Sequence, residues 1–166
     1  MPLKEIVECV PNFSEGKDKS VIDKICAAIK TVETVEILDI DMGSDTNRTV
    51  VTFIAESEYV GKAAFKGIEK AAELIDMSKH TGAHPRMGAT DVCPFIPVSN
   101  VSMEDCIDIA KKLGNNVGEL LKIPVFLYEM AAANEERRNL ANVRSGEYEG
   151  LGEKLKDENR KTRQSK

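Results

Sequence analysis

Aromatic residues, long apolar runs and closely spaced cysteines are scarce or absent in this chain. Aromatic residues make up 5% of its 166 residues, and tryptophan is missing. No charged segment followed by an apolar run opens the chain, and its apolar runs are only a few residues long. About 20 consecutive apolar residues are needed to span a bilayer. We therefore expect a soluble protein that has no membrane partner.

A basic stripe on the surface is also missing. The chain has 23 Lys and Arg residues against 28 Asp and Glu residues, which gives a net charge of −5. Outside the last dozen residues, no basic run is interleaved with aromatic residues. Such a pattern is typical of nucleic-acid-binding domains, because phosphate contacts dominate their affinity. We therefore expect no nucleic-acid partner.

The four cysteines lie far apart and form no C-x-x-C pair. Each of them falls within a predicted strand or helix: Cys9, Cys26, Cys93 and Cys106. Zinc sites and disulfide frameworks have characteristic cysteine spacings, whereas isolated buried thiols are typical of reducing compartments. The pattern predicts neither a disulfide nor a zinc site, and it favours a cytoplasmic location.

The spacing of apolar residues predicts one compact α/β domain. An apolar content of 42% is sufficient for a core at this length. Strands are expected at residues 5–10, 35–40, 48–54, 92–98 and 123–127, and helices at 21–30, 57–76, 103–121 and 134–142. The order βαββαβαβα favours an α/β sandwich with a mixed β-sheet covered by helices. No repeat of fixed period is present, which excludes a solenoid.

Several local signals refine these elements. Pro94 and Pro97 each remove a ladder donor, so the fourth strand is expected at an edge or an end of the sheet. Ser57 is suited to cap the second helix. Ser102 and Asp105 have the spacing of a capping box, with an acid in the reciprocal position.

The segment before the fourth predicted strand gathers both histidines of the chain. His80 and His84 are four residues apart, like the metal ligands of the H-E-x-x-H helix in metalloproteases. Here Thr81 replaces the glutamate, Gly82 disfavours a helix and Pro85 follows, so a metal site is disfavoured. A loop histidine is instead suited to act as a general base, because an ordinary imidazole accepts and returns a proton near neutral pH.

The charged residues near these histidines each have two interpretations. Arg86 presents a planar fork that matches a carboxylate, or it ties the loop to the domain through carbonyl groups or Asp91. Arg48 can contact an anionic ligand at the end of the sheet, or it faces solvent. The aspartates around Gly43, which include Asp41, resemble the start of a calcium loop without its other ligands. A solvated turn is favoured there, although an aspartate at a strand end often faces a site.

Five segments, in collinear order, resemble one protein family. They are ECVPNFSEG at residues 8–16, NRTVVTF at 47–53, HPRMGATDVCPFIPV at 84–98, IPVFLY at 123–128 and GEYEGL at 146–151. The third segment is too long and too specific to arise from composition. Together they resemble the N-terminal subdomain of glutamate formiminotransferase, as it occurs in formiminotransferase-cyclodeaminase.

The resemblance implies transfer of a formimino group from N-formimino-L-glutamate to N5 of tetrahydrofolate. This reaction is a step of histidine degradation that feeds one-carbon metabolism, with tetrahydrofolate as co-substrate and no metal. The family's catalytic histidine, in its G-x-H-P-R-M-G motif, falls on His84, which would serve as both base and acid. The expected substrate-binding residues are Arg86, Arg48, Asp41, Asn12 and His80.

The end of the chain departs from the family pattern. In the family, the Gly-Glu-Tyr-Glu segment continues into a Pro-Asp-Phe-Gly-Pro stretch that helps to bind folate, and then into a second α/β subdomain. Here a charged run follows Leu151. We therefore expect an N-terminal subdomain at 1–151, a disordered tail at 152–166 and no C-terminal subdomain.

Two hypotheses about function follow. In the first, the chain is an enzyme whose groove is completed by a homo-oligomer or by a separately encoded C-terminal subdomain. In the second, it is a non-catalytic or truncated single subdomain that needs a separate second half and acts as a folate-binding, partner-binding or interaction module. Exposed apolar surface is expected where the second subdomain would dock.

Overall fold

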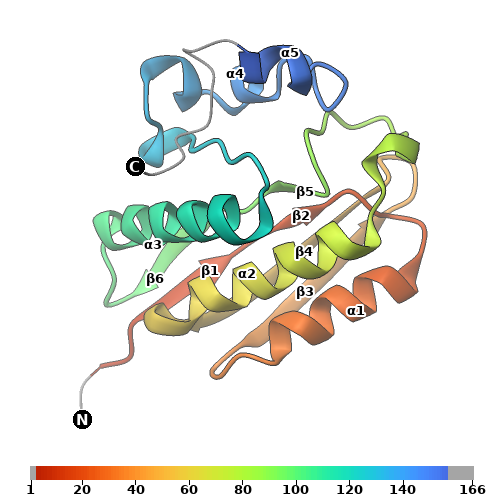
Figure 1. Ribbon diagram of the computed structural model, residues 1–166. Helices are drawn as coiled ribbons and strands as arrows, with labels where there is room; N and C mark the ends of the chain where they lie inside the picture. The colour runs from red at the N-terminus through yellow and green to blue at the C-terminus, as the bar shows by residue number, and fades with distance from the viewer. Residues whose placement is uncertain (1–2, 157–166) are drawn as a thin grey trace.

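The computed structural model describes residues 3–156, which form one sheet and a set of long and short helices (Figure 1). The strands are β1 (Ile6–Cys9), β2 (Asn12–Phe13), β3 (Glu36–Gly43), β4 (Arg48–Glu56), β5 (Thr90–Val92) and β6 (Phe95–Ser99). The α-helices are α1 (Lys19–Lys30), α2 (Ser57–Leu74), α3 (Met103–Asn116), α4 (Leu140–Arg144) and α5 (Leu151–Lys156). Among these residues, no helix is long and apolar enough to cross a membrane.

The six strands form four rows. β1 and β2 make up one row with a break between them, and β5 and β6 make up another. β1 and β2 share one edge of β4, and β3 pairs with the other edge. On the far side, β6 pairs with β1 and β5 pairs with β2. Pro11 lies in the first break and Pro94 in the second. β5 and β6 stand at the two ends of the strand order, so the edge position expected from the prolines is confirmed.

All the strand pairings among the described residues are antiparallel, so the sheet is antiparallel where a mixed one was expected. The helical connections explain the difference. α1 joins β2 to β3 and α2 joins β4 to β5, and each joined pair runs in the same direction with one strand between its members. This split β-α-β arrangement makes every neighbour antiparallel. The predicted α/β sandwich is confirmed.

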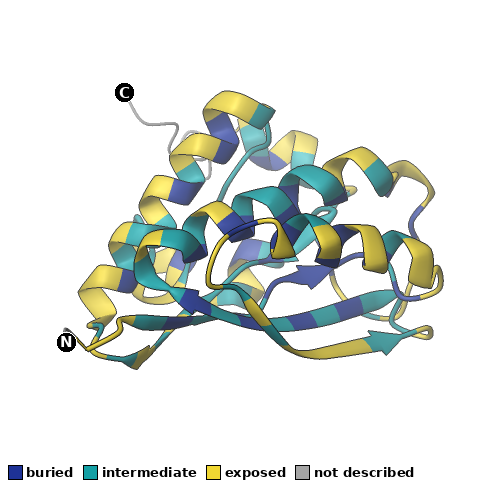
Figure 2. Ribbon diagram, turned by 90° about the horizontal axis from the view of Figure 1, so that it is seen from below, coloured by how far each residue is buried: buried dark blue, intermediate teal, exposed yellow. Residues whose placement is uncertain are grey.

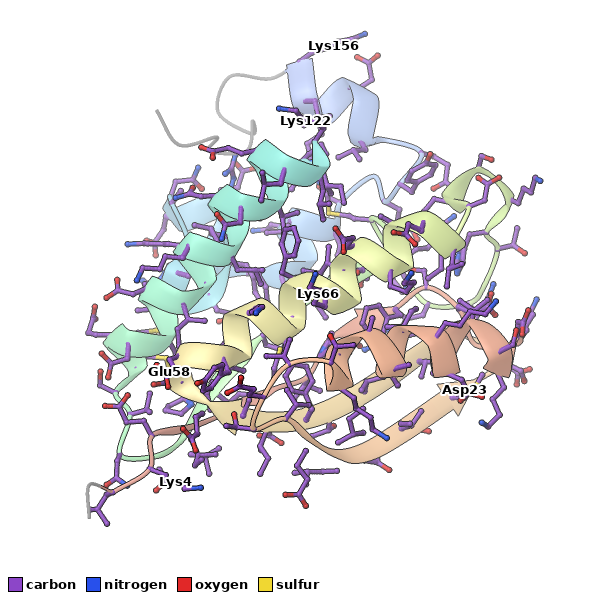
Figure 3. The ribbon with its side chains drawn as sticks, turned by 60° about the horizontal axis from the view of Figure 1, so that its bottom comes forward. Lys4, Asp23, Glu58, Lys66, Lys122 and Lys156 are labelled. Carbon is purple, nitrogen blue, oxygen red and sulfur yellow. The ribbon has the colours of Figure 1, made fainter. Side chains whose placement is uncertain are left out.

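The core lies between the sheet and the layer of α1, α2 and α3, which covers one face of the sheet (Figure 2). β4 alternates between buried and partly exposed residues, as expected of a strand with one covered face. The buried face of β4 meets the apolar stripes of α1 and α2, and the residues concerned are Val51, Phe53, Ala55, Ile22, Ile25, Ile29, Val60, Ala64 and Ile68. Asp23 on α1 and Lys66 on α2 carry their charges on the outer surface of this helix layer (Figure 3).

The helix starts follow the sequence signals in part. Ser102 and Asp105 form the predicted capping box at the start of α3. α2 begins at Ser57, but its N-cap position is Glu56, which makes no side-chain cap bond. The Ser57 hydroxyl donates to the carboxylate of Glu5 instead.

The C-terminal third differs most from the prediction. Residues 123–127 were expected to form a strand, but they join no ladder of the sheet. Val125 and Leu127 instead pack against Gly114 of α3, and Pro124 has no N–H to offer a ladder. Beyond α3, the chain continues as a short π-helical turn at Val117–Leu121.

The remaining predicted elements lie near the end of the chain. The helix expected at 134–142 is split into a 3-10 turn at Glu135–Arg138 and α4. The first residues of the expected tail, 152–156, belong to α5. The rest of that tail, 157–166, lies outside the described residues.

Candidate active site

Three loops meet at one end of the sheet: residues 14–16 after β2, the β3–β4 turn at 44–47, and the loop at 80–89 before β5. Glycines allow the loops to touch. A Cβ on Gly16 would lie 2.9 Å from the carbonyl carbon of Gly43, and a Cβ on Gly82 would lie 2.9 Å from that of Thr46. In both cases the carbonyl oxygen is closer still, so only glycine fits.

Asn47 joins the three loops. It adopts a left-handed backbone with φ of 49°, which asparagine tolerates better than most residues. Its side chain accepts from the Gly16 N–H at 2.9 Å and donates to the Thr81 carbonyl at 3.0 Å. Its own carbonyl accepts from the His80 ring at 2.9 Å. Both histidines are therefore carried by a loop that is fixed to the sheet.

Arg48, the first residue of β4, lies between Asn12 and His84. One terminal nitrogen of its guanidinium donates to Oδ1 of Asn12, and the other donates to Nε2 of His84. Asn12 is buried, and its amide nitrogen is held at 2.9 Å by the Val10 carbonyl. The break between β1 and β2 thus fixes Asn12, and Asn12 in turn aims Arg48 at the imidazole.

The hydrogen bonds of His84 define its tautomer. Arginine can only donate hydrogen bonds, so Nε2 of His84 is the acceptor of the bond from Arg48. In a neutral imidazole the other ring nitrogen, Nδ1, then carries the hydrogen. Nδ1 then donates to the Pro85 carbonyl at 2.6 Å. His84 is thus a neutral imidazole with its basic nitrogen on the Arg48 side. A proton acceptor is present, but the guanidinium occupies its lone pair in this state.

Asp41 lies on the same face of the sheet as these groups. It pairs with Val50, which on its other side pairs with Asn12, and directly paired residues point to the same face. Arg48 is two residues from Val50 and therefore shares that face. No helix among the described residues covers this face (Figure 2). Asp41 is exposed and lies on the same face of the sheet as Arg48.

His80 and Arg86 lie behind this group, in a connected set of hydrogen bonds. His80 donates through Nε2 to Asn47, so its Nδ1 is free to accept the 3.0 Å bond from Nε of Arg86. The guanidinium of Arg86 also pairs with Glu149 at 2.6 Å and with Glu147 at 3.2 Å. Both nitrogens of His80 and most donors of Arg86 thus have protein partners.

The Arg86 contacts favour the second of its two interpretations, although Glu147 and Glu149 take the place of Asp91 as partners. Hydrogen bonding to Glu149 raises the pKa of Arg86, and bonding to Arg86 lowers the pKa of Glu149 to about 2. The Tyr148 N–H also donates to the Arg86 carbonyl at 3.0 Å. Arg86 therefore fastens the 146–149 segment to the histidine loop.

Sequence reasoning missed the pair of Asp91 and Arg144. The Asp91 side chain is 2% exposed, and it binds Arg144 at 2.5 Å and the Met87 N–H at 2.6 Å. Burial lowers the pKa of Arg48, and the positive charge of Arg144 lowers it further. Arg144 thus adds a second cation near Arg48. Asp91 falls within a motif, but no pattern in the sequence marks Arg144.

The structure brings three of the six expected site residues into contact, places a fourth on the same face of the sheet and puts the other two behind them. Asn12, Arg48, His84 and Asp41 share the open face, while His80 and Arg86 hold the loop. Direct contact of any of them with substrate stays a prediction. Among residues 3–156, no group of three or more His, Cys, Asp or Glu side chains is arranged to hold a metal ion.

This arrangement occurs in a sequence with well-defined relatives. Residues 6–165 match the family described as "Formiminotransferase domain, N-terminal subdomain". The chain is 53% identical over 154 residues to the formimidoyltransferase-cyclodeaminase of Mus musculus, covering 93% of this chain and 28% of the mouse protein. It is 50% identical over 155 residues to the glutamate formimidoyltransferase of Thermoplasma acidophilum, covering 92% of this chain and 51% of that protein.

A bacterial relative gives the same result. Identity to the glutamate formimidoyltransferase of Streptococcus pyogenes is 46% over 156 residues, which covers 94% of this chain and 52% of the relative. The chain thus spans about half the length of these two transferases and under a third of the mouse formimidoyltransferase-cyclodeaminase. With a family match over almost its whole length, the chain belongs to the formiminotransferase family, in which it corresponds to the N-terminal subdomain.

Proposed function

We propose that this chain acts in the transfer of a formimino group from N-formimino-L-glutamate to N5 of tetrahydrofolate, as one half of a glutamate formimidoyltransferase. The placement of the His84 imidazole, with Nε2 bonded to Arg48 and Nδ1 bonded to the Pro85 carbonyl, is the observation that supports this proposal best. It lies on the open face of the sheet, in a loop anchored at several points, with its basic nitrogen directed away from the backbone. Relatives named glutamate formimidoyltransferase support the assignment.

The transfer requires one proton to move twice. N5 of the folate forms a bond to the formimino carbon and must lose its proton. The bond from that carbon to the glutamate nitrogen then breaks, and this nitrogen must gain a proton. A single base can perform both steps, so His84 takes the proton from N5 on Nε2 and returns it to the departing amine.

Arg48 must leave Nε2 before His84 can act. A carboxylate is a better acceptor for a guanidinium than a neutral imidazole, because two parallel charge-assisted bonds become possible. Nε of Arg48 is buried and has no hydrogen-bond partner in the described structure, so the side chain has a further donor to satisfy. We propose that a substrate carboxylate draws Arg48 onto itself and frees the base only when substrate is bound.

The second half of the longer relatives supplies the other wall of the groove in this proposal. Arg48 and His84 lie on a sheet face that no described helix covers. A groove with this sheet as its only wall would leave the reacting atoms exposed to water. Arg86, Asp41, Asn12 and His80 remain proposed substrate-binding residues. For Arg86 and His80, which already have protein partners, the action is indirect, through the position of the loop.

The test is formimino transfer to tetrahydrofolate, measured by chromatography of the folate product. The purified chain is assayed alone and with the separately expressed C-terminal half of the Thermoplasma acidophilum relative. Turnover by the chain alone supports an oligomeric enzyme, and turnover only with the added half supports a divided one. A folded chain that binds the added half and still shows no transfer would overturn the proposal and favour an interaction module.

A further inference from the structure

We propose that Cys9 and Cys93 are an oxidation-sensitive dithiol, which a hydroperoxide converts reversibly into a disulfide. The Sγ atoms of the two residues lie 3.6 Å apart, at van der Waals contact, although 84 residues separate them in sequence. All four cysteines of the chain are described and carry free thiols. The inference does not depend on formimino transfer.

The pair lies where two neighbouring rows of the sheet are both interrupted. Cys9 is the last residue of β1, and Cys93 follows β5 directly. Between the flanking ladders, the Val10 N–H donates to the Pro94 carbonyl at 3.3 Å. A disulfide requires its sulfur atoms to approach to about 2.0 Å, so the sulfurs must move closer. Interrupted strands permit such a shift more readily than a continuous ladder does.

The two thiols differ in how they meet solvent. Cys9 is fully buried, whereas Cys93 is partly exposed. Cys93 also lines a cavity of about 600 Å³ between α3, the ends of β5 and β6, and the chain that follows α3. Small oxidants therefore reach Cys93 first. The cavity includes Cys106 in its lining, but that thiol has no cysteine beside it.

Electrostatics assign different roles to the two sulfurs. Burial raises the pKa of the Cys9 thiol, and its hydrogen bond with Cys93 raises it further. The charge of Glu8 acts in the same direction. Cys9 therefore remains protonated as the resolving thiol, and Cys93, with its access to the cavity, is the thiol that attacks the oxidant.

The proposed reaction is balanced by the hydroperoxide. The Cys93 thiolate attacks one peroxide oxygen, the O–O bond breaks, and the leaving oxygen takes up a proton to give water or an alcohol, with a sulfenic acid on Cys93. The Cys9 sulfur then attacks the Cys93 sulfur and loses its proton, while the S–O bond breaks and water leaves. Two thiols lose two electrons in total, and the peroxide gains them.

The experiment treats the reduced, purified chain with hydrogen peroxide and then alkylates the remaining thiols under denaturing conditions. Peptide mapping is expected to show Cys9 and Cys93 linked, and dithiothreitol is expected to restore both thiols. Cys26 and Cys106 should stay alkylated throughout. Oxidation of Cys93 to sulfinic acid without a linked peptide would overturn the proposal, as would equal oxidation of all four cysteines.

Variants separate the pair from general oxidation. In Cys93→Ala, Cys9 is expected to stay a free thiol during peroxide treatment and to be alkylated afterwards. In Cys9→Ala, dimedone is expected to trap a sulfenic acid on Cys93. The matched control, Cys106→Ala, removes another thiol that lines the same cavity and should leave the Cys9–Cys93 link unchanged. Loss of the link in this control, with the fold intact by circular dichroism, would contradict the assignment.

Discussion

At the residue scale, the bond between Arg48 and His84 decides what the site can do. An imidazole whose Nε2 accepts from a guanidinium is neutral and correctly oriented, but its lone pair is occupied. In the proposed mechanism, a substrate carboxylate releases this base. The proposal therefore gives the two partners separable effects on kinetics, with His84 acting on the chemical step and Arg48 acting on binding.

The variant His84→Asn is expected to lower kcat by about 10²–10⁴-fold, which is the usual loss when a general base is removed. KM should change little, because the imidazole moves a proton and holds no carboxylate. Both values are measured in steady-state transfer assays of the chain combined with the C-terminal half of the Thermoplasma acidophilum relative. Lys79→Ala is the control, since this side chain is 84% exposed in the same loop region. A His84→Asn enzyme with unchanged kcat would remove His84 from the mechanism.

The variant Arg48→Ala is expected to raise the KM for the substrate whose carboxylate Arg48 holds by about tenfold or more, since hydrogen bonds to charged groups contribute about 1.5–3 kcal/mol. Arg48→Lys should recover only part of the loss, because an ammonium cannot bind a carboxylate with a planar fork. Michaelis constants for formiminoglutamate and tetrahydrofolate are measured separately. If both constants match the wild type, Arg48 has no role in carboxylate binding.

At the element scale, the loop that carries His84 is held by close backbone contact on one side and by charge on the other. A Cβ on Gly82 would overlap the backbone of Thr46 in the β3–β4 turn. Arg86 fastens the opposite side to the 146–149 segment. The position of the His84 imidazole therefore depends on two elements that contain none of the proposed catalytic groups.

Gly82→Ala is expected to destabilise the protein by about 1–3 kcal/mol, the usual cost of forcing an extra methyl group into a packed site. Activity should fall as well, because the loop must shift to relieve the overlap. Urea unfolding gives the free energy of unfolding for both proteins. Gly152→Ala is the matched control, since a Cβ there has no neighbour within 4 Å. Equal stability of Gly82→Ala and wild type would show that the turn yields easily.

The Arg86–Glu149 pair gives a prediction about pH. Bonding to Arg86 holds the pKa of Glu149 at about 2, below its usual value of 4.5. The folded protein thus binds fewer protons than the unfolded chain in this range. The stabilisation is fully present above pH 4.5 and is lost as the pH falls toward 2. At low salt, the difference in urea midpoint between wild type and Glu149→Gln should therefore be larger at pH 7 than at pH 3.

A control for this prediction is Glu153→Gln, which removes a carboxylate that is 83% exposed and pairs with Lys156. Exposed pairs of this kind contribute little, so its urea midpoint should match the wild type at both pH values. A gap between wild type and Glu149→Gln that stays constant from pH 7 to pH 3 would mean that the two proteins differ for a reason other than this carboxyl group.

Local patterns predicted some elements well and failed where distant contacts decide. The alternation in 48–54 and the helical spacing of α1 and α2 are set by burial on one face, which the sequence records directly. The segment 123–127 has the composition of a strand, yet it packs on α3, because joining a sheet depends on a partner edge that composition does not reveal. The strand directions were likewise hidden, since no local signal shows which strand lies between two others.

The candidate site shows the same division. His84 was predicted because its motif is continuous in sequence. The hydrogen bond that occupies the lone pair of His84 was not predicted. It depends on Asn12 in β2 and Arg48 in β4, which are distant from His84 in the sequence. The carboxylate partners of Arg86, Glu147 and Glu149, are more than sixty positions away in the sequence. Contacts at such separation are fixed by the fold and leave no trace in local spacing.

At the scale of the whole molecule, the open face of the sheet is the main feature to explain. Ile96 pairs with Glu8, which pairs with Ile54, so the two isoleucines share this face. Val98 on β6 is 56% exposed and Ile96 is 38% exposed. These apolar side chains lie on the same face of the sheet as Arg48, which bonds to His84. An exposed apolar surface on the face that carries the proposed catalytic residues is expected to be covered in the active protein.

Val98→Lys is therefore expected to weaken association of the chain, either with itself or with the second half of a longer relative, by about tenfold or more, because a charge replaces an apolar contact. Sedimentation equilibrium measures the dissociation constant. The control, Leu120→Lys, changes a side chain that is 70% exposed in the turn after α3 and should leave it unchanged. Wild-type chain that stays monomeric at high concentration, ignores the second half and binds no hydrophobic dye would show that the open face needs no cover. In that case the groove would have one wall, and the proposed release of His84 by a bound carboxylate would take place in open water, where competing solvation removes most of its advantage.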